Sequence, residues 1–143
     1  MDIPPEVVIK ATIRYGSVFY FPNEKFSSPF YHYFIVINSE PTSDRIIYLI
    51  CASSQIHTVN VRRKGFPPDT LVRINPNQYS GFTFDSILDC NDVHEQTIDE
   101  LVKRLSDGRL TLMPEMDGAL VDKLRQGVLS SPLVSPKIKS QMV

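Results

Sequence analysis

The chain has 143 residues, of which 42% are apolar and 22% charged, and its net charge is −1. These values are typical of a globular protein with one domain, and they exclude an argument for nucleic-acid binding from bulk charge. Any anionic partner must be met by a local basic patch. No run approaches the roughly 20 apolar residues of a membrane span, and the N-terminus lacks the features of a secretion signal. We therefore expect a cytoplasmic protein that does not associate with membranes.

Up to about residue 90 the pattern predicts short β-strands between turn residues. The predicted strands cover residues 16–21, 33–37, 45–52, 70–74 and 85–90. Cys51 and Cys90 lie within two of these apolar runs, and without a secretory context we expect two buried, reduced thiols. Short strands punctuated by Pro, Gly and Asn favour a small barrel or sandwich built from an antiparallel sheet.

After a short polar turn at residues 91–96, the apolar period becomes that of a helix. Positions 98, 101, 102 and 105 are apolar and form one stripe at i, i+3, i+4 and i+7 spacing. Thr97 and Glu100 have the spacing of a capping box, in which each side chain binds an otherwise unpaired backbone N–H. Gly108 suits a left-handed residue at the end of this helix.

A second helix is predicted to begin at Pro114, because proline suits the first helical turn. The residues that this helix is expected to bury are Leu120, Val121, Leu124 and Val128. Residues 131–143 are rich in Ser and Pro, and we expect a flexible tail there. The predicted domain therefore covers residues 1–130: it is mainly β with α, a small antiparallel β-barrel with two C-terminal helices.

Three histidines are the candidates for acid–base chemistry. His57 lies in a polar stretch after a strand, where we expect a solvated side chain. His32 stands at the entrance to the most apolar strand, and His94 lies in the polar turn. Each of these two is explained either by a local hydrogen bond or by a place in a functional site. The spacing of the histidines and cysteines matches no zinc motif, so we predict no metal site and no cofactor.

One basic run, Arg62-Arg63-Lys64, precedes a turn at residues 65–68 that contains Gly and Pro. Such a run is usually a solvated loop. On a near-neutral protein, three adjacent cations also suit a mobile arm that binds phosphates, of the kind that positions RNA. The residues alone leave both interpretations open.

Four blocks in order resemble the MazF/PemK/Kid-like toxins: GSVFYF at 16–21, HYFIVIN at 32–38, RIIYLICASSQI at 45–56, and DSILDCNDVHEQTIDEL at 85–101. In that family a Gly-led strand precedes a block that an arginine opens. A strand ending in a hydroxyl-hydroxyl-Gln turn follows, and then a strand that runs into D-Q-apolar-R and a helix. The turn is present here as Ser53-Ser54-Gln55. The resemblance covers roughly residues 15 to 130, and it depends on the order and spacing of the blocks.

The resemblance implies an SH3-like barrel of the CcdB/MazF type. It also implies a metal-independent endoribonuclease that cuts single-stranded RNA, a homodimer, and an antitoxin peptide lying in the same groove. This sequence departs from the family where its chemistry is concentrated. The two family arginines fall on His32 and His94, and the D-Q pair falls on Asn91-Asp92. Two imidazoles therefore replace two guanidinium groups.

Imidazole, with a pKa of about 6.5, transfers protons more readily than guanidinium, whose pKa exceeds about 12. We therefore expect His32 and His94 to be the acid–base pair, in unassigned order, and Ser54 to orient the phosphate. The other expected RNA contacts are Gln55 for a base or the backbone, Arg62, Arg63 and Lys64 for phosphates, and Tyr31 with Tyr33 for stacking.

Two other functions are compatible with the same residues. A toxin-like fold that has lost activity would be a non-catalytic module that binds RNA or a peptide. In a structural accessory protein, the polar turn would only precede the helix cap. A shared site requires His32, Ser54 and His94 to lie within roughly 12 Å of one another, because all must reach one reacting centre.

Overall fold

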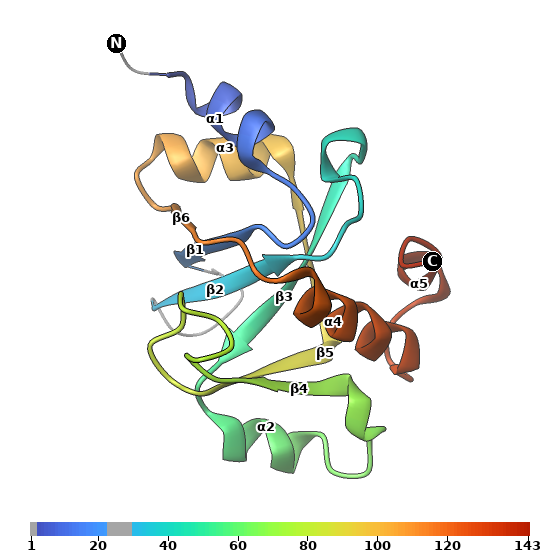
Figure 1. Cartoon of the computed structure of the whole chain (residues 1–143). Coiled ribbons are helices and arrows are strands. Elements are labelled where there is room, and N and C mark those ends of the chain that lie inside the picture. The colour runs from blue at the N-terminus through green and yellow to red at the C-terminus, as the bar shows by residue number, and fades with distance from the viewer. Residues whose placement is uncertain (1–2, 23–29) are drawn as a thin grey trace.

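The computed structural model describes residues 3–22 and 30–143, and its centre is a six-stranded antiparallel sheet (Figure 1). The strands are β1 (Val18–Pro22), β2 (Tyr31–Val36), β3 (Ile46–Ser53), β4 (Leu71–Ile74), β5 (Ser86–Thr97) and β6 (Thr111–Met113). Their order across the sheet is β4-β5-β3-β2-β1-β6, and all neighbours are antiparallel. The fold is therefore α+β. The sheet is open, with β4 and β6 at the edges of the described strands, so barrel closure is not confirmed.

The helices of the described residues are α1 (Pro5–Thr12), α2 (Ile56–Arg62), α3 (Ile98–Ser106), α4 (Gly118–Ser130) and α5 (Pro136–Ser140). Figure 1 shows α1 and α3 together at one end of the sheet, α2 at the opposite end, and α4 across one face. None of these helices is long and apolar enough to cross a membrane.

The central strands are apolar on both faces because both faces are covered. Phe34 and Leu49 belong to a cluster with Ile9 of α1 and Leu101 of α3. Their neighbours Ile35 and Ile50 point the opposite way and pack with Val121, Leu124 and Val128 of α4. Because successive strand residues alternate between faces, a sheet covered on both sides requires near-continuous apolar runs. This requirement explains the runs at β2 and β3.

Gly127 lets α4 lie close to the sheet. A Cβ atom at this position would lie 2.7 Å from both Asp69 O and Cys90 Sγ. A side chain here would therefore push the helix away from β5. The approach is close enough that only a residue without a side chain fits.

The polar turn predicted at residues 91–96 is wrong, because β5 continues through these residues to Thr97. Ile50 pairs with Val93 and Ala52 pairs with Leu88, so residues 89–92 of β5 oppose Cys51 alone. Such a bulge lets a strand carry extra residues and redirect their side chains. The polar side chains thus belong to a bulged strand.

The predicted helix cap is confirmed. Thr97 Oγ1 accepts a hydrogen bond from Glu100 N at 3.1 Å, and Glu100 Oε1 accepts one from Thr97 N at 3.0 Å. Gly108, just beyond α3, has a φ of 71°. These features are local, so the sequence alone was sufficient to predict them.

The second predicted helix is present, but it begins at Gly118 instead of Pro114. The segment before it is held by other contacts. Tyr79 Oη donates to Pro114 O at 2.5 Å, and Met116 N donates to Gly16 O at 2.9 Å. The four side chains expected to be buried by this helix are buried: Leu120, Val121, Leu124 and Val128.

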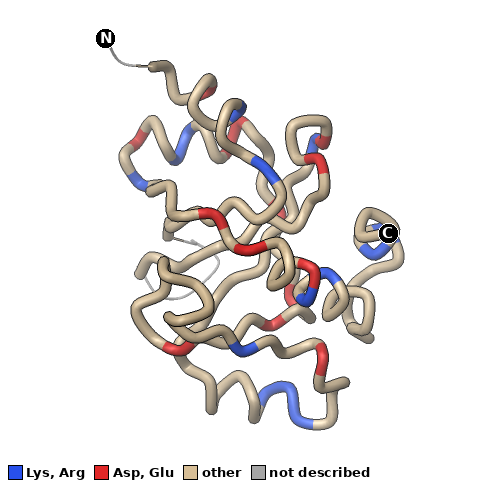
Figure 2. Tube along the Cα trace, viewed as in Figure 1, with Lys and Arg blue, Asp and Glu red and all other residues tan. Residues whose placement is uncertain are grey.

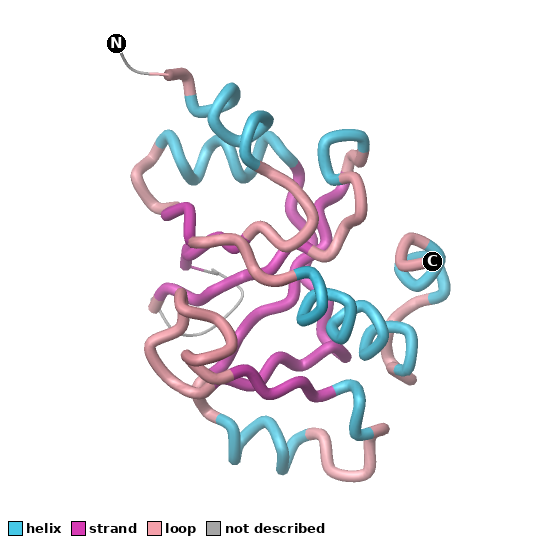
Figure 3. The backbone as a smooth tube through the Cα atoms, viewed as in Figure 1, coloured by secondary structure: helices cyan, strands magenta, loops and turns pink. Residues whose placement is uncertain are grey.

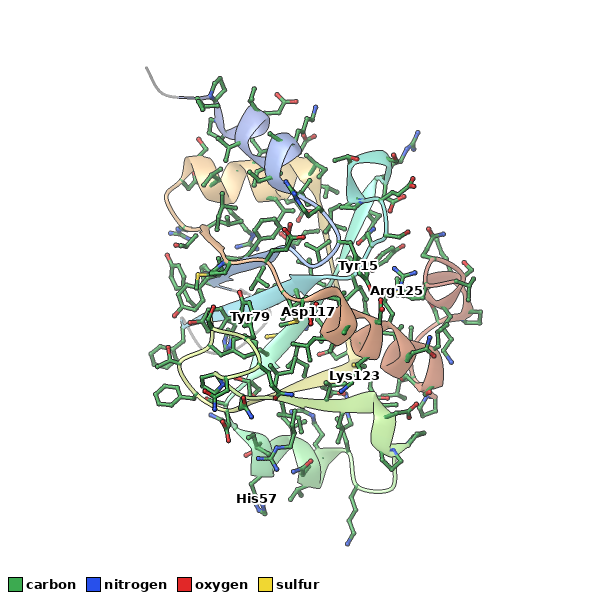
Figure 4. The ribbon with its side chains drawn as sticks, in the orientation of Figure 1. Tyr15, His57, Tyr79, Asp117, Lys123 and Arg125 are labelled. Carbon is green, nitrogen blue, oxygen red and sulfur yellow. The ribbon has the colours of Figure 1, made fainter. Side chains whose placement is uncertain are left out.

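The C-terminal residues differ from the flexible tail that the sequence predicted. They form α5, and Val134 and Met142 pack into the core. Arg125 of α4 donates to Ile37 O at 2.6 Å and to Met142 O at 2.8 Å. Figure 4 shows Arg125 beside Tyr15, and its guanidinium carbon lies 5.6 Å from the centre of the Tyr15 ring. The C-terminal residues are therefore held against α4 by the hydrogen bond from Arg125 to Met142 and by core packing.

The connection between β4 and β5, residues 75–85, contains neither helix nor strand (Figure 3). It nevertheless contributes two buried rings, Tyr79 and Phe82, whose centres are 4.7 Å apart. Both rings belong to the core cluster that contains the buried side chains of α4, on the face opposite α1 and α3.

Candidate functional site

A cavity of about 500 Å³ lies between β2, β3, β5 and α2. The predicted site residues that line it are His32, Ser54, Gln55, Arg62, Arg63 and His94. They come from four separate elements or their ends, so the fold brings together residues up to 62 positions apart. Their proposed roles stay predictions, but His32, Ser54 and His94 lie on the walls of one cavity.

The sheet register explains why the two imidazoles reach the same cavity. His32 and Phe34 lie on one face of β2, and Phe34 is opposite Cys51 of β3. Leu49, on the same face of β3, is opposite His94 of β5. His32, Cys51 and His94 therefore project from three adjacent strands toward one side. Burial, together with the charge of His94, lowers the pKa of His32.

A carboxylate accompanies His94. The Nε2 atom of His94 lies 3.5 Å from Asp92 Oδ2, and its ring packs nearly perpendicular to that of Phe34 at a centroid distance of 5.4 Å. The His94 side chain is 11% exposed, whereas that of Asp92 is 54% exposed. The hydrogen bond with His94, supported by the nearby positive charges, lowers the pKa of Asp92. This contact therefore favours the ionised form of the Asp92 carboxylate.

Asp89 holds the arginines at the end of α2. Its Oδ2 atom accepts from Arg63 Nε at 2.7 Å and from Arg62 Nη2 at 3.4 Å. Its Oδ1 atom accepts from Asn91 N at 3.1 Å and from Asn91 Nδ2 at 2.9 Å. The Asp89 side chain is only 9% exposed, so these partners compensate for the burial of its charge.

The same network reaches the C-terminal segment. Ser131 Oγ donates to Asn91 Oδ1 at 2.6 Å and accepts from the backbone N–H of Leu133 at 3.1 Å. Ser131 is fully buried and Asn91 is 6% exposed. The cavity wall, the bulge of β5 and the chain after α4 are therefore joined by one buried polar network.

The basic run is not the mobile loop that the sequence suggested. Arg62 is the last residue of α2, and Arg63 caps it. Arg63 is 15% exposed and engaged with Asp89, whereas Arg62 is 53% exposed. Figure 2 shows the run as a continuous basic stretch at the end of α2. Lys64 is exposed but does not line the cavity, so Arg62 is the cation best placed to meet an anion there.

Two further predicted positions lie away from the cavity. Tyr31 alternates with His32 along β2, so its ring lies on the other face, 5.3 Å from the ring centre of Tyr20. Tyr33 shares that face and lies 4.6 Å from Tyr20. These rings are not placed to stack a base in the cavity. His57 points away from the protein on α2, as expected for a solvated side chain (Figure 4).

The sequence interpretation missed Cys51 and Asp89 as lining residues and gave no role to Asp92. Asp89 carried a usable signal, because a carboxylate inside the apolar run SILDC requires a buried partner. Cys51 carried none. Burial raises the pKa of the Cys51 thiol to about 12, so it remains a neutral thiol at neutral pH.

Comparison of the sequence with models of protein families and with curated proteins finds no match. Residues 3–22 and 30–143 contain no group of three or more His, Cys, Asp or Glu side chains placed to hold a metal ion. The function is therefore argued from the chemistry of the cavity.

Proposed function

We propose that the protein is an endoribonuclease that cleaves single-stranded RNA in this cavity, on a fold related to the MazF/PemK/Kid-like toxins. The main support is that two imidazoles, the Ser54 hydroxyl and the Arg62 guanidinium line one cavity of about 500 Å³. Cleavage by the 2′-hydroxyl of RNA needs a base, an acid and positive charge for the phosphorane, and these groups can supply all three.

The order of the elements supports the relationship. β3 ends at the Ser53-Ser54-Gln55 turn and is followed by α2, while β5 leads directly into the capped helix α3. The Ser53-Ser54-Gln55 turn is the closest of the matches to the family pattern. The relationship to an SH3-like barrel is part of this proposal, and the described strands form an open sheet.

Single-stranded RNA is the substrate that suits the site. A cavity of about 500 Å³ accepts one splayed nucleotide but not a duplex, in which the bases are stacked and paired. The resemblance further implies that no metal takes part, that the protein is a homodimer, and that an antitoxin peptide occupies the same groove.

The test is incubation of the purified protein with mixed-sequence single-stranded RNA in EDTA. We expect fragments with 2′,3′-cyclic phosphate ends. His32→Ala and His94→Ala should each lose about 10²- to 10⁴-fold in rate, the usual contribution of one acid or base. His57→Ala, which changes an exposed histidine outside the cavity, should retain full activity. Intact RNA with the wild-type protein would rule out the nuclease.

A second candidate is a non-catalytic module that binds RNA or a peptide through the same cavity. The observation in its favour is that Asp89 neutralises part of the positive charge of Arg62 and Arg63. This function predicts saturable binding without cleavage. It also predicts that His94→Ala leaves binding largely unchanged.

A further inference from the structure

We infer that His32 is the general base and His94 the general acid of RNA cleavage, and that Asp92 is the positioning residue that contacts His94. The inference rests on the proposed endoribonuclease function. It assigns the order of the two histidines, which the sequence left open, and it gives a role to a carboxylate that the sequence did not single out.

The two imidazoles have different surroundings. Asp92 Oδ2 lies 3.5 Å from Nε2 of His94, and a carboxylate at this position stabilises the protonated ring. His32 is disfavoured as a cation by burial and by the charge of His94, both of which lower its pKa. A positive charge on one imidazole disfavours a second positive charge nearby, and this repulsion acts on His32. A neutral imidazole accepts a proton and an imidazolium donates one.

The other charges in the cavity do not reverse this difference. Among the described residues, the other charged and titratable side chains that line the cavity are Cys51 of β3, Arg62 and Arg63 at the end of α2, and Asp89 and Asp92 of β5. Cys51 is a neutral thiol, because burial raises its pKa to about 12. The Asp89 carboxylate is engaged with both arginines and with Asn91. Asp92 is therefore the carboxylate that contacts His94.

The reaction step follows from this assignment. Neutral His32 takes the proton of the 2′-hydroxyl while the 2′-oxygen forms a bond to phosphorus. The bond between phosphorus and the 5′-oxygen breaks, and His94 donates its proton to that oxygen. The products are a 2′,3′-cyclic phosphate and a free 5′-hydroxyl, with His32 protonated and His94 neutral. Proton exchange with water restores both rings, and no other reactant is required.

Substrates that differ in their leaving group separate the acid from the base. The first is a mixture of dinucleotides with all four bases at the cleaved nucleotide, whose 5′-alkoxide must be protonated as it leaves. The second is the matching mixture of nucleoside 3′-(4-nitrophenyl phosphates), from which nitrophenolate departs without a proton. Loss of an acid therefore slows only the first, whereas loss of a base slows both.

We expect His94→Ala to lose about 10²- to 10⁴-fold on dinucleotides and much less on the nitrophenyl esters. Asp92→Asn should show the same pattern with a smaller loss of about tenfold, because it removes only the residue that positions the acid. His32→Ala should lose activity on both substrates. Glu95→Gln, which changes an exposed neighbouring carboxylate, should match the wild type on both. Far-ultraviolet circular dichroism shows whether each variant is folded, and His94→Gln and His32→Gln replace any alanine variant that is not.

Several results would overturn the inference. If the nitrophenyl esters rescue His32→Ala and not His94→Ala, the order is the reverse. If Asp92→Asn loses equally on both substrates, Asp92 does not act through the acid. If the wild-type protein is active on both substrates, either of these two results overturns the assignment of acid and base and leaves the endoribonuclease proposal standing. A wild-type protein inactive on both overturns the endoribonuclease proposal, and the assignment falls with it.

Discussion

Replacing Asp89 with alanine is the sharpest test of what fixes the wall of the cavity. The change removes the acceptor of Arg63 Nε, 2.7 Å away, and of Asn91 Nδ2, 2.9 Å away. Arg63, with a side chain that is 15% exposed, would be left as a nearly buried cation without this carboxylate. Arg62 is 53% exposed, and water replaces the contact that it loses.

The expected loss in the free energy of unfolding is about 3 kcal/mol. Breaking a buried ion pair on one side costs about 3–5 kcal/mol, and the residual exposure of Arg63 places the value near the lower limit. The contact of Arg62 adds at most about 1 kcal/mol, as expected for an exposed pair. Asp89→Asn should lose less, because an amide oxygen still accepts from Asn91.

Urea unfolding followed by far-ultraviolet circular dichroism measures this change, because the chain contains no tryptophan to provide a fluorescence signal. The midpoint should fall while the slope with urea stays constant. Asp85→Ala is the matched control: it removes an exposed carboxylate just before β5, and its effect should stay within about 0.5 kcal/mol. A loss below about 1 kcal/mol for Asp89→Ala would refute the role of Asp89 as the anchor of the α2 arginines.

Three further outcomes are expected. Gly127→Ala should lower the free energy of unfolding in urea by about 1–3 kcal/mol, because its Cβ would lie 2.7 Å from a backbone oxygen and a buried sulfur. Gly118→Ala is the control and should be almost neutral, because its Cβ would lie 4.0 Å from the nearest neighbouring atom. The pKa of His32 is lower in the folded protein than in the unfolded chain, so the unfolded chain protonates His32 at a higher pH. Protonation of His32 therefore favours unfolding, and stability decreases below about pH 6.5. His32→Gln should reduce this decrease between pH 7.5 and about 5.5, and His57→Gln should retain it. Burial raises the pKa of Cys51 to about 12, so this thiol should resist iodoacetamide at pH 8 in the native protein and react in urea. Mass spectrometry measures the labelling, and rapid labelling of the native protein would contradict the burial of Cys51.

The features that the sequence predicted correctly depend on short spacings. The cap of α3 needs only Thr97 and Glu100, three residues apart. The apolar stripe of α4 repeats with the helical period, and its buried positions followed directly. Where a local pattern competed with distant contacts, the prediction failed: the start of α4 is displaced to Gly118, since Pro114 and Met116 are held by residues far away in the chain.

The sequence predicted which residues could take part in the candidate site, and only the tertiary structure shows that they line one cavity. His32 and His94 were named from the sequence because each stands where the family resemblance places a functional residue. The pattern did not show that Asp92 accompanies His94 or that Asp89 binds Arg63. The polar residues 91–96 looked like a turn because no local pattern distinguishes a turn from a bulged strand.

The sequence by itself determined the elements whose stabilising contacts are near neighbours: the apolar central strands, the capped α3 and the buried face of α4. The tertiary structure decided the open sheet, the continuation of β5 to Thr97, and the joining of α2 to β5 through Asp89. It also decided that His32, Ser54 and His94 share one cavity. These features depend on strand register and on buried charge pairs between residues far apart in the chain, which no local periodicity records.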